Sequence, residues 1–147
     1  MRQKIIMWSL MGLLAGTSLS VTNTLQAQPA FRGSQVRTLP IAAALSDRDR
    51  PASDRAQDKI RKPGELLAFA GMGPGMKVAD LMPGRGYFTR IFSNVVGKSG
   101  HVYALVAAER IAEKPDAADA VKTIAADPAF SNVSVLTESM QALSLPV

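Results

Sequence analysis

The amino-acid sequence predicts an α/β fold built on a parallel sheet. Three short apolar runs, at residues 76–82, 101–106 and 132–137, have the length and composition of buried strands. Helical patterns separate these runs, and strands that alternate with helices are typical of a parallel sheet with right-handed crossovers. The 147 residues suffice for one ordinary domain. A hydrophobic content of 47% with 20% charged residues favours a globular chain.

The first 27 residues have the order of a secretory signal peptide. Arg2 and Lys4 precede an apolar run of 11 residues, and a polar stretch with small residues ends at Ala27. The run is about half of the roughly 20 residues that a membrane-spanning helix needs. We therefore expect cleavage after Ala27 and no stable membrane span afterwards; an uncleaved N-terminal anchor is the alternative. An exported chain without cysteine fits the bacterial periplasm or secretion, where disulfides are permitted but not required.

Two segments precede the first predicted strand-helix unit. Residues 28–46 have no sustained period and contain proline and glycine, so we expect an extended leader ahead of a domain at residues 47–147. Within residues 47–62 the charges alternate in sign, which is typical of a solvated helical face. Asp58 and Lys62 are four residues apart, in the order that stabilises a helix.

The helices that alternate with the strands have clear start and stop signals. Pro63 and Glu65 begin a helix that ends at Gly71. The helix after the first strand ends at Gly97 and has apolar residues at positions i, i+3, i+4 and i+7, namely Phe88, Ile91, Phe92 and Val95. Residues 115–127 form the predicted helix between the second and third strands.

The turn after the first strand carries the chemistry, and reads Asp80-Leu81-Met82-Pro83-Gly84-Arg85-Gly86. Glycines let backbone approach a ligand closely, and the helix that follows offers free N–H donors. A carboxylate just before the glycines suits a ligand with an ammonium, a sulfonium or hydroxyls better than a pyrophosphate. Asp80, with Pro83 inside the turn, therefore disfavours a nicotinamide-dinucleotide site. A tight turn without a ligand is the structural alternative.

This segment resembles the cofactor loop of Rossmann-like S-adenosylmethionine-dependent methyltransferases, in particular an exported, periplasmic subgroup. In that pattern an acidic residue precedes Gly-x-Gly-x-Gly: Asp80 matches the acid, and Gly84 and Gly86 match the second and third glycines. Met82 stands where the first glycine is expected. The resemblance spans about residues 48–146. It implies a Rossmann-like three-layer α/β/α sandwich, S-adenosylmethionine as cofactor, and a methyl acceptor that the sequence does not identify.

Two further acids are candidates for cofactor contacts. In dinucleotide folds the ribose-binding acid lies roughly 20 residues beyond the glycines. Glu109 lies 23 residues beyond Gly86 and reaches a ribose only if residues 106–108 curl back as a loop; a charge at a helix N-terminus is its alternative role. Glu138, just past the third strand, stands where this fold often contacts the adenine, and a solvated loop acid is the alternative there.

The composition excludes several kinds of chemistry. Cysteine is absent, which excludes metal sites with thiolate ligands and cysteine nucleophiles. His101 is the only histidine, which excludes metal sites with several histidine ligands. The net charge is +5, and cleavage after Ala27 removes Arg2 and Lys4 and leaves +3, which is well short of a nucleic-acid-binding stripe. No nucleophile with its base, and no acid/base pair, can be named as catalytic.

The fold that the chain resembles has seven strands, and its fourth strand pairs beside the first. We therefore expect this chain to be the N-terminal, cofactor-binding half of a longer enzyme, inactive alone and with an exposed strand edge. The alternative function is a non-catalytic exported protein that binds a small molecule through the same fold.

Overall fold

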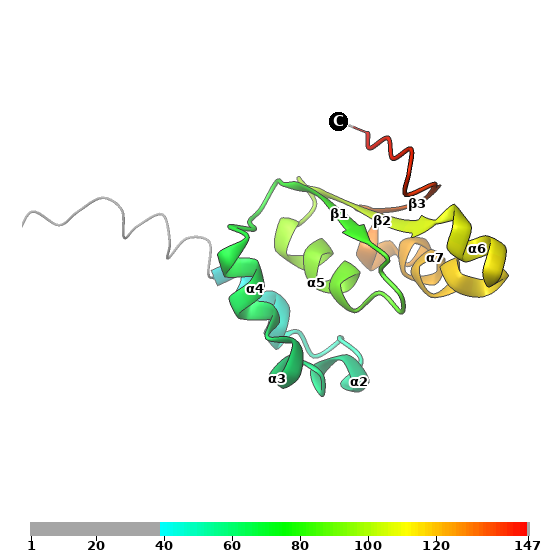
Figure 1. Ribbon diagram of the computed structural model, residues 1–147. Coiled ribbons are helices and arrows are strands. Elements are labelled where there is room, and N and C mark those ends of the chain that lie inside the picture. Colours follow the sequence, from blue (N-terminus) through cyan, green and yellow to red (C-terminus); the bar gives the residue numbers. More distant parts are fainter. Residues whose placement is uncertain (1–38, 147) are drawn as a thin grey trace, which may run out of the picture.

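The computed structural model describes residues 39–146 (Figure 1). The predicted signal peptide and residues 28–38 of the predicted leader lie outside the described residues. After a helical stretch over residues 39–46, the elements in chain order are α2 (Ala52–Arg55), α3 (Asp58–Arg61), α4 (Pro63–Phe69), β1 (Lys77–Leu81), α5 (Tyr87–Val96), β2 (His101–Ala107), α6 (Ala108–Glu113), the 3₁₀ helix η1 (Pro115–Ala118), α7 (Asp119–Ala126), the 3₁₀ helix η2 (Pro128–Phe130) and β3 (Val133–Glu138). No helix within residues 39–146 is long and apolar enough to cross a membrane.

The three strands form a parallel sheet in the order β1-β2-β3, which confirms the predicted α/β fold and its Rossmann-like character. Val78, Val102 and Val133 lie side by side in the register. The crossover helices α5 and α7 lie on the same face of the sheet (Figure 1). Successive right-handed crossovers in one direction place both helices there. Residues 39–146 therefore show two of the three layers that the resemblance implies.

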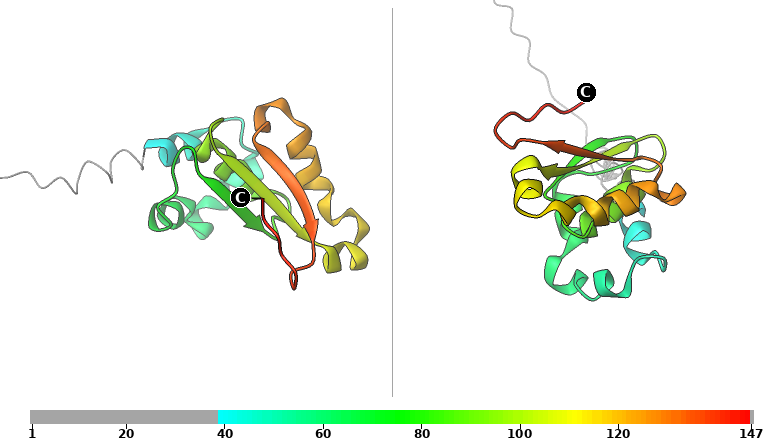
Figure 2. Two further views of the ribbon diagram at one scale, coloured as in Figure 1. Left: turned by 90° about the horizontal axis from the view of Figure 1, so that it is seen from above. Right: turned by 90° about the vertical axis from the view of Figure 1, so that its right-hand side faces the viewer.

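Figures 1 and 2 place the remaining segments around this two-layer unit. The helices α2 and α3 lie beyond α5, on the side away from the sheet. The segment after β3 turns back over the opposite face of the sheet (Figure 2). Leu105 points to that opposite face and is fully buried, although it does not belong to the main core. Both faces of the central strand β2 are thus covered.

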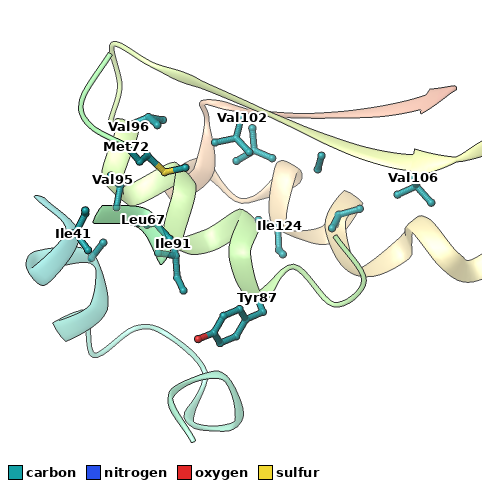
Figure 3. Close-up of a cluster of buried hydrophobic side chains, with 14 of the residues drawn as sticks. Ile41, Leu67, Met72, Tyr87, Ile91, Val95, Val96, Val102, Val106 and Ile124 are labelled. Carbon is teal, nitrogen blue, oxygen red and sulfur yellow. The ribbon is translucent and has the colours of Figure 1, made fainter. Parts of the chain in front are cut away.

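The main core lies between the sheet and the helices α5 and α7 (Figure 3). Alternate residues of β2 enter it, since successive side chains of a strand point to opposite faces. Each large aliphatic side chain buried there contributes about 1.5–3 kcal/mol through the hydrophobic effect. The most buried members are Leu67, Ile91, Val95, Val96, Val102, Ala104, Ala118 and Val121.

The extended leader predicted for residues 28–46 is wrong for its last eight residues, because residues 39–46 are helical. Ile41, Ala44 and Leu45 follow a spacing of i, i+3 and i+4, and this short apolar stripe packs on the core. Figure 3 shows Ile41 beside Leu67 of α4. An apolar stripe of one helical turn is too short to be recognised as a helical period in the sequence. The helix forms because packing on the core buries these side chains.

The solvated helical face predicted for residues 47–62 holds only in part: most residues of the segment are exposed, but two charged side chains are buried. The segment forms two four-residue helices, α2 and α3, and both Arg50 and Asp54 are buried. Lys62 takes a left-handed φ of 47° and ends α3, and its ammonium pairs with Glu65. Asp58 pairs with Arg50 rather than with Lys62. Arg50, Asp54 and Asp58 therefore form contacts inside the fold, whereas the other charges of the segment remain mostly exposed.

Candidate functional site

The turn between β1 and α5 has an unusual backbone. Met82, Gly84 and Gly86 all have left-handed φ angles, of 56°, 58° and 80°. For Met82 this conformation costs about 1–2 kcal/mol relative to an ordinary right-handed one. Met82 stands at the position of the first glycine in the Gly-x-Gly-x-Gly pattern that this turn resembles. The Met82 N–H donates to the Leu105 carbonyl at 3.0 Å, and this hydrogen bond continues the pairing of β1 with β2. The turn thus keeps a glycine-type conformation at a position where the side chain is not glycine.

The two predicted glycines have different surroundings. A Cβ on Gly84 would meet no atom within 4 Å, so this residue borders open space. A Cβ on Gly86 would overlap the Ile124 side chain, because α7 packs against the start of α5 at this point. Gly84 therefore leaves open space beside the backbone, whereas Gly86 lies where α7 packs against the start of α5.

Asp80 lies near the end of β1, with its side chain directed toward α5. It is 7% exposed, and the Thr89 hydroxyl donates to its Oδ2 at 2.6 Å. Burial raises the pKa of Asp80 above its ordinary value, while the hydrogen bonds from Thr89 act in the opposite direction. Thr89 orients the carboxylate in surroundings that contain little water, where a cationic group would be attracted more strongly than at the surface.

Two cavities border the turn, one on each side. The larger has a volume of about 590 Å³ and lies between the turn, the end of β2 and α6–α7; its charged lining residues are Arg85, Arg110, Lys114, Asp116 and Asp119. The smaller, of about 370 Å³, lies between the turn and α2–α3; its polar and aromatic lining includes Ser53, Asp54, Gln57, Arg61, Asp80, Arg85, Tyr87 and Phe88. The residues 82–85 line both cavities.

Glu109 and Glu138 line neither cavity. A ribose contact by Glu109 requires a loop over residues 106–108, and this loop is absent, since β2 continues through Ala107 and α6 begins at Ala108. Glu109 therefore lies in the first turn of α6, the alternative that the sequence left open. Its carboxylate accepts from the Ser139 hydroxyl, which lowers the pKa of Glu109. Glu138 accepts from the Ser144 N–H at 2.8 Å. Both acids hold the segment that follows β3.

His101 lies at the opposite end of β2 from the glycine turn. Its Nε2 is 2.9 Å from the Ser134 hydroxyl on β3, and its ring contacts that of Tyr103. Arg85 is exposed in the turn itself. Within residues 39–146, no three His, Asp or Glu side chains gather as ligands for a metal ion.

A polar network that the sequence did not predict joins the N-terminal helices to α5. Arg50 donates two bonds to Asp58, at 2.7 and 2.8 Å, and a third to the Leu45 carbonyl. The Tyr87 hydroxyl points from the start of α5 toward these helices (Figure 3) and donates to Asp58 at 2.6 Å. Arg50 lowers the pKa of Asp58. Burial, followed by the bond to Asp58, raises the pKa of Tyr87 to about 12.

Arg90 connects the same helices to the glycine turn. Its Nη1 donates to Asp54 of α2 at 3.1 Å and to the backbone carbonyls of Arg85 and Gly86 at 3.1 and 3.2 Å. The turn is therefore fixed from both sides, by α7 at Gly86 and by α2 through Arg90. The only signal for this contact in the sequence is the position of Arg90, one helical turn after the glycine turn.

No protein-family model matches the chain, and no curated protein matches its sequence. The fold and the turn define a small α/β protein with a three-stranded parallel sheet and flanking helices, Rossmann-like in character.

Proposed function

We propose that the chain binds S-adenosylmethionine at the glycine turn and serves methyl transfer to an acceptor that is still to be identified. One observation carries the proposal: a buried, oriented carboxylate, Asp80, comes immediately before a left-handed turn that opens α5 between two cavities. The open space at Gly84 admits a ligand close to the backbone. The predicted export signal places this activity in the periplasm or outside the cell.

The residues of the turn suit this cofactor chemically. S-adenosylmethionine carries an ammonium and a sulfonium, and it supplies an activated methyl group for an in-line displacement. Asp80 provides a negative charge for these cations, and the turn provides backbone donors at the start of α5. The contribution of the protein to such a reaction is to hold donor and acceptor in attack geometry. The contacts of the turn with Arg90 and Ile124 support that task, because they hold its backbone from two sides.

Calorimetric titration of the full chain with S-adenosylmethionine and S-adenosylhomocysteine tests the proposal. We expect saturable binding that Gly84→Leu abolishes, because the new side chain would enter the cavities beside the turn. Gly75→Leu is the matched control: Gly75 also has a left-handed φ, of 79°, but lies outside both cavities. Absence of binding by the unchanged chain, or equal losses in the two variants, would contradict the proposal.

The larger cavity supports a second candidate, a non-catalytic exported protein that binds a small anionic molecule. Arg85, Arg110 and Lys114 give its lining three cations against two carboxylates. Such a lining suits a nucleotide phosphate. Tighter binding of ADP than of S-adenosylhomocysteine in the same titrations would favour this candidate.

A further inference from the structure

The face of the sheet opposite α5 and α7 carries a row of leucines. Leu81, Leu105 and Leu136 are partners in the register of the three parallel strands. Successive side chains of a strand point to opposite faces, and the neighbours of Leu105 along β2, Ala104 and Val106, belong to the main core. The three leucines therefore lie side by side across the other face, and we call them the leucine row.

The leucine row is covered unevenly. Leu105 is fully buried and Leu136 is half-buried, whereas Leu81 is 47% exposed. Figure 2 shows that residues 139–146 turn back over this face of the sheet. Parallel sheets are normally covered on both faces by helices. Here an irregular segment provides the cover at the centre of the row.

This segment brings apolar side chains to the sheet but no backbone pairing. Met140, Leu143 and Leu145 are 40%, 38% and 36% exposed, so more than half of each residue is covered. Among residues 39–146, no backbone hydrogen bond joins residues 139–146 to a strand. The segment therefore lies on the sheet without forming a fourth strand.

Two carboxylates from different elements anchor the segment. Glu109 of α6 accepts from the Ser139 hydroxyl and, at 3.5 Å, from the Met140 N–H. Glu138 at the end of β3 accepts from the Ser144 N–H at 2.8 Å. All these hydrogen bonds are exposed to solvent, where water competes and the net contribution of each bond to stability is modest. Segments with exposed bonds and few buried contacts open locally at low free-energy cost.

We propose that residues 139–146 are a releasable strap, which Glu109 and Glu138 hold over the leucine row and which opens as one unit while the sheet stays folded. Opening exposes Leu105 and Leu136 and turns this face into an apolar surface. Closing shields the same side chains from water. The strap is a conformational switch on a face of the sheet that the proposed function does not use, and it does not depend on that function.

Amide hydrogen exchange of the full chain, resolved by residue, tests whether the strap opens as one unit. Glu109→Ala removes the anchor at one end, yet it should speed exchange of the Ser144 N–H near the other end about fivefold or more. Glu138→Ala should likewise speed exchange of the Ala142 N–H, which donates to the Ser139 carbonyl. Exchange of the β2 amides should stay within about twofold, because the sheet remains folded.

Fluorescence of the apolar dye anilinonaphthalene sulfonate tests what lies beneath the strap. The double variant Glu109→Ala/Glu138→Ala should bind more dye than the unchanged chain. Leu81→Ser in the double variant should reduce this gain, because Leu81 belongs to the leucine row. Leu66→Ser is the matched control, since Leu66 is also 47% exposed but lies on α4, and it should leave the gain unchanged.

Glu113→Ala is the control for the carboxylates of α6, because Glu113 pairs with Arg110 instead of with the strap. Unchanged exchange of Ser144 in Glu109→Ala, or the same acceleration in Glu113→Ala, would overturn the proposal. Exchange of the β2 amides that accelerates together with the strap would also overturn it, since the sheet would then open as well. Equal dye binding by the double variant and the unchanged chain would show that the strap covers no apolar surface.

Discussion

Gly86 and Ile124 are packing partners across α5 and α7: a Cβ on Gly86 would overlap Cδ1 of Ile124. The glycine that begins α5 thus has two reasons to be glycine, its left-handed φ of 80° and the close approach of α7. Neither reason involves a ligand. A substitution here would affect the fold as well as any binding.

We predict that Gly86→Ala lowers the free energy of unfolding by about 2–5 kcal/mol. Strain in the left-handed region accounts for roughly 1–2 kcal/mol, and overpacking against Ile124 accounts for about 1–3 kcal/mol. Gly84→Ala, with a similar φ and open space around its Cβ, should lose only the strain contribution. Urea denaturation measures both variants. Equal losses would show that α7 does not constrain Gly86.

Asp80 should make stability depend on pH in a defined direction. Its pKa in the folded chain is raised by burial, so the folded state binds more protons than the unfolded state between the ordinary value of 3.8 and the raised value. The stability contributed by protonated Asp80 is complete below pH 3.8 and is lost as the pH rises through the raised pKa. Asp80→Asn should therefore gain stability relative to the unchanged chain over that interval. A stability difference that is independent of pH in urea titrations would refute the assignment.

The Arg50–Asp58 pair should stabilise the junction between the N-terminal helices and α5. Asp58→Asn leaves the buried Arg50 charge without its carboxylate, and should cost about 3 kcal/mol at neutral pH. Because Arg50 lowers the pKa of Asp58, this contribution is present above pH 3.8 and is lost as the pH falls through the lowered value. Thermal denaturation measures this loss of stability. The control is Asp116→Asn, which removes an exposed carboxylate 3.8 Å from Lys114 and should cost less than about 1 kcal/mol in the same measurement.

The outer edge of β1 should promote self-association. Among the described residues β1 pairs only with β2. Met82 N–H and Met76 C=O point toward β2, so the alternation of a strand directs the N–H groups of residues 77, 79 and 81 to the free edge. Light scattering should show association that increases with concentration. Ala79→Pro, which removes one edge donor and no bond of the sheet, should reduce it; an equally associated variant would exclude this edge.

Export should remove the first 27 residues. Since a basic start, an apolar run of 11 residues and small residues precede Gln28, the mature chain should begin at or near Gln28. Intact-mass measurement of periplasmic material determines the terminus. Recovery of the full-length chain from the inner membrane would indicate an uncleaved anchor instead.

Local sequence patterns predicted one part of the candidate site, at the glycine turn, and failed for the more distant acids. Asp80 and Gly84 were predicted from their place after a strand and before a helix, and both border the cavities at the turn. Glu109 was assigned by its distance from the glycines, but its reach depends on where β2 ends. That end, at Ala107, is set by pairing with Glu138 of β3, a contact that sequence spacing does not express.

From residue 63 onward the sequence by itself determined the order and type of the strands and of most of the helices that connect them. It did not predict α6, and the helix predicted for residues 115–127 begins as the 3₁₀ helix η1. Apolar periodicity and glycine or proline at the ends act within a few residues, so each such element is encoded where it lies. Only the tertiary structure decided which polar groups meet. Tyr87 and Asp58 are 29 residues apart and Arg90 and Asp54 are 36 apart, and they are in contact because α2 and α3 pack on α5. The sequence pattern of residues 47–62 is typical of solvated charges, and only packing against α5 brings Asp54 and Asp58 into contact with Arg90 and Tyr87.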